Sequence, residues 1–110
     1  MTDRKVFVVD RDTRHDISDA RRFGEITYIY DERDRKPSVW SNALIKDVMA
    51  RLERCDYDAD LDYILVVGNV VTIVMIVANL AMAYDTLNLL LFDASQEEYV
   101  HKTVTPVLSA

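Results

Sequence analysis

The chain has 110 residues, the usual size of one domain, and half of its residues are hydrophobic, a proportion that excludes intrinsic disorder. Its 13 basic and 19 acidic side chains give a formal charge of -6, which argues against binding to nucleic acid. Cys55 is the only cysteine, so an internal disulfide is excluded. We expect residues 1–110 to form a single α/β domain in the reducing cytoplasm of a cell.

The first third of the chain predicts two strands joined by a polar segment. Residues 5–9 form a short apolar run, and residues 25–30 are rich in β-branched and aromatic side chains. Between them we expect a helical turn over residues 18–23, ended by Gly24 in the position that glycine favours after a helix. Residues 31–38 form a charged loop.

A long amphipathic helix follows this loop. Ser41 is placed as its N-cap, and Trp40 and Ile45 have the spacing of a hydrophobic staple across the helix start. Apolar residues then recur at helical spacing at Leu44, Ile45, Val48, Met49 and Leu52.

The next segment raises the question of a membrane span, because residues 63–84 contain no charge over 22 positions. Aspartates flank both ends, and no lysine or arginine nearby supplies the cationic anchor of a spanning helix. Gly68 and Asn69 divide the segment into a buried strand over residues 63–67 and a helix over about residues 70–84. We therefore predict no membrane association.

The tail adds a hairpin. Residues 87–92 predict a strand, residues 93–97 a turn, and residues 98–104 an antiparallel partner strand. The alternation of strands and helices in the middle of the chain is that of a βαβ unit with a right-handed crossover. The predicted fold is thus α/β, a small mostly parallel or mixed sheet of four to five strands with two main helices around a βαβ core.

The second helix is apolar almost all round, although a helix lying on a small sheet buries only one face. The surplus apolar surface predicts self-association, with a dimer as the first expectation. Thr72 and Asn79, seven residues apart, are expected on one face and available for hydrogen bonds across an interface. The expected interface residues are Val70, Ile73, Val74, Val77, Asn79, Leu80 and Ala81.

The junction between the buried strand and this helix is a candidate ligand site. Gly68 permits close approach to the backbone, and the amides of a helix N-terminus favour an anion such as a phosphate. Asn69 and Thr72 complete the predicted site. A turn followed by an N-cap explains the same residues and is the interpretation that we favour, while the ligand site remains open.

The sequence shows no catalytic constellation, no metal site and no cofactor motif. Alternating aspartates follow the first helix as in half of a calcium-binding loop, but Leu61 and Val67 stand where that loop needs glycine and glutamate. No pair of histidines or cysteines has the spacing of metal ligands. Tyr28 and Tyr30 are expected on one strand face, as in a stacking platform for single-stranded nucleic acid, but the net charge favours a role in the core.

Three segments of the chain resemble a class of small accessory proteins encoded by tailed bacteriophages. They are Phe23-Gly24-Glu25-Ile26, the run from Asp62 to Asn69, and Leu90-Leu91-Phe92-Asp93 followed by Tyr99-Val100. In that class an aspartate often follows the glycine, where this chain has Asn69. The resemblance implies a phage origin and an α/β fold, and it brings no catalytic residues with it.

Three functional hypotheses follow. The first is a phage-encoded accessory protein without enzymatic activity, which self-associates and binds an unidentified protein partner in the cytoplasm of the bacterial host. The second is a phosphate- or nucleotide-binding domain or small enzyme with its site at Gly68, Asn69 and Thr72. The third is a virion or assembly component.

Overall fold

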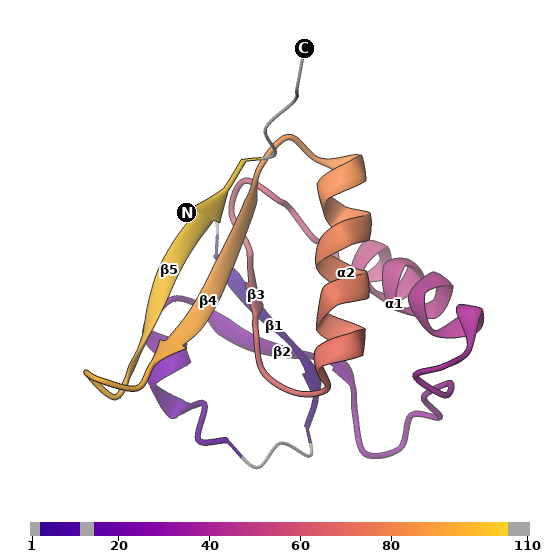
Figure 1. The fold of residues 1–110 in the computed structure, drawn as a ribbon, viewed down its shortest axis with the longest axis horizontal. Coiled ribbons are helices and arrows are strands. Elements are labelled where there is room, and N and C mark those ends of the chain that lie inside the picture. Colours follow the sequence, from indigo (N-terminus) through magenta and orange to yellow (C-terminus); the bar gives the residue numbers. More distant parts are fainter. Residues whose placement is uncertain (1–2, 12–14, 106–110) are drawn as a thin grey trace.

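The computed structural model describes residues 3–11 and 15–105 and confirms the predicted α/β fold (Figure 1). Its sheet has five strands in the order β2-β1-β3-β4-β5; β5 runs antiparallel to β4, and the other neighbouring pairs are parallel. The elements in chain order are β1 (Lys5–Asp10), the 3-10 helix η1 (Ser18–Arg22), β2 (Glu25–Tyr30), α1 (Asn42–Arg54), β3 (Tyr63–Leu65), α2 (Val70–Ala83), β4 (Leu87–Asp93) and β5 (Glu98–Val104).

The two α-helices cover one face of the sheet, and η1 covers the other (Figure 1). The chain steps from β2 past β1 to β3 and on to β4 in one direction, but from β1 to β2 in the opposite direction. Because crossovers between parallel strands are right-handed, this reversal puts η1 on the face opposite the helices. It also creates a switch point between β1 and β3, where doubly wound α/β proteins commonly bind ligands.

Each face of the sheet has its own apolar cluster, and β1 contributes to both. Phe7 and Val9 join the cluster under α1 and α2, whereas Val6 and Val8 join the cluster under η1. This alternation follows from the two-residue period of a strand. Because both faces of β1 are covered, all four side chains are at most 4% exposed.

The apolar face of α1 packs against the sheet as its sequence pattern predicted. The hydroxyl of Ser41 accepts a hydrogen bond from the amide of Ala43 at 3.1 Å, and Leu44, Val48 and Leu52 are all buried. Trp40, however, is 82% exposed, so it buries little surface in the staple expected with Ile45. The helix start therefore depends on the serine cap.

Gly24 directly follows Phe23, the C-cap residue of η1, as predicted, but it is not in the left-handed conformation that often accompanies this position. Among the glycines of the described segments, Gly68 alone has a positive φ, at +117°. Gly24 serves instead for close packing, since a Cβ there would lie 2.5 Å from the carbonyl oxygen of Arg4. That oxygen also accepts the amide of Glu25 at 2.9 Å, so the glycine lets β2 start directly beside β1.

Tyr28 and Tyr30 do not share a face of β2, contrary to expectation. Tyr28 packs against the cluster on the η1 side, whereas Tyr30 belongs to the cluster under the helices. Tyr30 is the last residue of the strand, where the strict alternation of side chains ends. Because Tyr30 is 2% exposed, its ring is not available to stack on a nucleic acid base.

The uncharged segment divides into a strand and a helix, as predicted. β3 ends two residues earlier than expected, because the amide of Val67 turns back to the carbonyl of Leu65 at 3.0 Å. Across residues 3–11 and 15–105, no helix is both long and apolar enough to span a membrane.

Candidate functional site

One face of α2 is apolar and exposed. Val70, Val74 and Met82 are 71%, 60% and 89% exposed, and Ala78 is exposed between them. Residues four apart lie along one side of an α-helix, so these four side chains form a continuous row, here called the α2 row. No charged residue occurs anywhere in α2.

The opposite face of α2 is part of the core. Thr72, Ile73, Ile76 and Leu80 are buried there, and at most 6% of each is exposed. A threonine within this face is consistent with a helix packed on a sheet, because its methyl group fills space as a valine methyl would.

The predicted interface residues divide between these two faces. Val70, Val74 and Asn79 are exposed, Val77 and Ala81 are half-buried, and Ile73 and Leu80 lie in the core. Asn79 donates a hydrogen bond from its Nδ2 to the carbonyl of Met75 at 2.8 Å, within its own helix, and Thr72 is buried. Sequence reasoning missed Ala78 and Met82, because an all-round apolar helix does not reveal which side faces the sheet.

The predicted ligand residues form a helix cap beside the switch point. Oδ1 of Asn69 accepts hydrogen bonds from the amides of Val71 and Thr72 at 2.9 and 3.2 Å. Gly68 and Asn69 are exposed, whereas the side chain of Thr72 is buried and does not face the same opening. The cap occupies two of the amides that an anion would otherwise use.

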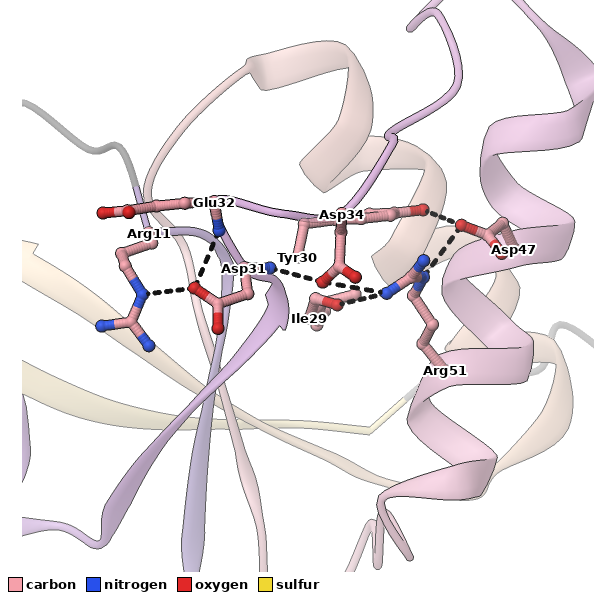
Figure 2. A network of polar contacts seen from close by, with 8 residues as sticks. All are labelled: Arg11, Ile29, Tyr30, Asp31, Glu32, Asp34, Asp47 and Arg51. Atoms are coloured by element: carbon pink, nitrogen blue, oxygen red, sulfur yellow. Dashed lines mark hydrogen bonds and ion pairs between the residues drawn. The ribbon is translucent and has the colours of Figure 1, made fainter.

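A network of ion pairs and hydrogen bonds fills the region where β1 and β2 end (Figure 2). Arg51 of α1 is its centre. Its guanidinium contacts Asp47 at 2.9 Å and Asp34 at 3.2 Å, and it donates to the carbonyl of Ile29 at 3.3 Å. Its cationic carbon lies 4.4 Å from the ring centre of Tyr30, whose hydroxyl donates to Asp47 at 2.6 Å. The network ties α1 to the end of β2.

A second arginine, Arg11, ties the end of β1 to the same loop. Its Nε donates to Asp31 at 2.8 Å (Figure 2). Its guanidinium also lies 4.2 Å from the ring centre of Tyr28. Nearby, both carboxylate oxygens of Asp10 accept hydrogen bonds from Lys36, at 2.9 and 2.8 Å. These ion pairs join the end of β1 to the loop after β2 and hold this loop in place.

The contacts of this network stabilise the ionised forms of Asp47 and Asp31 over their protonated forms. The hydrogen bond from Tyr30 and the contact with Arg51 lower the pKa of Asp47, and the amide of Glu32 together with Arg11 lowers the pKa of Asp31. Burial, reinforced by Asp47, raises the pKa of Tyr30. At neutral pH both carboxylates are ionised and the phenol is a proton donor.

We expect the free energy of unfolding of the Asp47→Asn variant to fall less than that of the wild type as the pH is lowered. A carboxyl whose pKa is lowered by folding stabilises the protein above its unfolded pKa, and this contribution is lost as the pH falls through the folded pKa. The effect thus belongs below about pH 4. Urea unfolding across this range measures it, with Glu32→Gln, an exposed carboxylate of the same loop, as the control. Equal acid sensitivity of the wild type and Asp47→Asn would contradict the prediction.

The fold and these sites place the chain among small α/β proteins with a mostly parallel sheet and an uncharged helix on its surface. Residues 4–106 match the model of a protein family described as phage Pam3 gp32-like protein. The chain belongs to this family, which confirms the phage resemblance drawn from its three segments. Comparisons with curated proteins and with solved structures gave no match.

Proposed function

We propose that this phage protein is a non-enzymatic accessory protein of the host cytoplasm, which forms a homodimer through the α2 row and in that form binds a protein partner. The single observation that carries the dimer is the exposure of Val70, Val74 and Met82 on a helix without any charge. An exposed apolar strip of this kind is typical of an interaction surface.

A second copy of the chain is the occupant that this surface fits. In an antiparallel pair of α2 helices related by a twofold axis, Val70 meets Met82 and Val74 meets the small Ala78, so each large side chain has a complement. The chain carries a net charge of -6, and an uncharged contact brings two such chains together without placing like charges in the interface. A single pair of helices buries little surface, so we expect a dissociation constant in the micromolar range.

Light scattering after size-exclusion chromatography tests the dimer. The wild type is expected to have the mass of two chains, and Val74→Lys the mass of one, because it places two ammonium groups in an apolar contact. The dissociation constant should rise at least about tenfold. Val100→Lys makes the same change at an exposed position of β5 and should leave the dimer intact. A wild type that remains monomeric at high micromolar concentration would refute the proposal.

The alternative of a phosphate or nucleotide site at Gly68 and Asn69 has one observation in its favour, the switch point between β1 and β3 beside which these residues lie. A bound anion has to replace Asn69 at the amides of Val71 and Thr72. Thermal unfolding with millimolar nucleotides, with and without Mg²⁺, distinguishes the two functions. A raised melting temperature that Asn69→Ala abolishes would favour the ligand site.

A further inference from the structure

A cleft opens at the edge of the sheet where the parallel strands begin. Both α-helices run antiparallel to these strands, so their C-terminal ends meet at this edge. The cleft has a volume of about 1030 Å³ and is lined by the last turns of α1 and α2, residues 56–60 and residues 83–86. Its size equals that of the larger small-molecule pockets of proteins.

The lining of the cleft is strongly acidic. Its one cationic side chain is Lys46, and its carboxylates are Glu53, Asp56, Asp58, Asp60 and Asp85. The ion pairs found within residues 3–11 and 15–105 all lie elsewhere in the molecule. The C-terminal ends of two helices add further partial negative charge at the same place. The cleft thus has a negative potential, and none of its carboxylates takes part in an ion pair within the part of the chain that the structure describes.

The cleft also has an aromatic and apolar wall. The rings of Tyr57 and Tyr84 meet edge to face with their centres 5.6 Å apart, and Tyr84 is 38% exposed. Met49, Ala50 and Leu80 lie beside them. The hydroxyl oxygen of Tyr57 is buried and has no hydrogen-bond partner among the described residues. This oxygen lies beneath the surface of the wall, so Tyr57 faces the cleft with its ring and not with its hydroxyl.

These features select an elongated organic cation. Nowhere in the described part of the chain are three His, Cys, Asp or Glu side chains close enough together to hold a metal ion, so the carboxylates of the cleft are dispersed. Dispersed carboxylates suit several separate cationic groups, an apolar wall suits their aliphatic stems, and a tyrosine ring suits a planar guanidinium.

We propose that the cleft binds arginine side chains of a basic segment of the partner protein. This inference deepens the proposed function, since it specifies the chemistry of the partner, and it concerns a surface separate from the α2 row. The guanidinium groups contact the carboxylates around the cleft, and their stems lie along Met49 and Ala50.

Isothermal titration of the full chain with a hexa-arginine peptide tests the proposal. Binding is expected, and the same peptide with citrulline in place of arginine should not bind, because citrulline keeps the shape and loses the charge. The double variant Asp56→Asn/Asp85→Asn should raise the dissociation constant at least about tenfold. Asparagine suits position 56, where φ is 55°, so this change preserves the backbone. Tyr84→Leu should also weaken binding, through loss of the aromatic contact.

The matched control is Glu25→Gln/Glu32→Gln, which removes two negative charges at exposed positions outside the cleft. It should change the affinity less than about twofold. Equal weakening by both double variants, or binding of the citrulline peptide, would overturn the proposal. Binding of spermidine without binding of the peptide would make the cleft a site for free polyamines and overturn the assignment to a protein segment. Light scattering of Asp56→Asn/Asp85→Asn should still give the mass of two chains, so that a loss of peptide binding is distinguished from a loss of the dimer.

Discussion

The variant Asp62→Ala is expected to lose about 3 kcal/mol or more of its free energy of unfolding. Asp62 is fully buried between the start of β1 and the segment before β3. Its two oxygens accept the amides of Lys5 at 2.9 Å and Asp58 at 2.8 Å, and the ammonium of Lys5 lies 3.3 Å away. Alanine leaves both partly buried amides without their acceptor and the lysine without its counter-charge.

Urea unfolding of Asp62→Ala and Asp60→Ala side by side provides the measurement. Asp60 is two residues away and exposed, and its replacement should change the stability by less than about 0.5 kcal/mol. Asp62→Asn keeps one acceptor oxygen and should fall between the two. A loss at Asp62 as small as that at Asp60 would show that the two amides find other acceptors.

The variant Leu80→Ala should lose about 2 to 5 kcal/mol, whereas Met82→Ala should be nearly neutral. Both residues belong to the last turns of α2, but Leu80 is 1% exposed and Met82 is 89% exposed. Removing the Leu80 side chain leaves a cavity between α2 and the sheet, whereas the side chain of Met82 already lies in solvent.

This comparison is best made in the Val74→Lys background, in which the proposed dimer is absent and each variant reports on the monomer alone. Thermal and urea unfolding should then agree on the order of the two losses. The reverse order would mean that α2 packs on the sheet through the face that we describe as the exposed row.

Much of the fold could be predicted because local patterns and tertiary packing agree. The serine cap and the apolar spacing of α1 specify that helix wherever it packs. The division at Gly68 and Asn69 was also predictable, since Gly68 has a positive φ and Asn69 caps α2. The pattern did not show that Gly24 is needed for contact with Arg4, because these residues are far apart in the chain.

The candidate sites were less predictable. The interface prediction included Ile73 and Leu80, which the structure places in the core, and omitted Ala78 and Met82, which are exposed. The cleft at the helix ends was not predicted at all, although its alternating aspartates were conspicuous. Its remaining walls come from the end of α2 and from residues 83–86, and only the folded chain brings them beside residues 56–60.

The sequence by itself determined the elements and their order, because helix caps, apolar periodicity and turn residues act over a few positions. Only the tertiary structure decided which side of the apolar helix α2 meets the sheet, which aspartates are paired, and which face solvent in the cleft. These outcomes depend on contacts between distant segments, and an all-round apolar helix or a run of alternating aspartates has no local feature that distinguishes one side from the other.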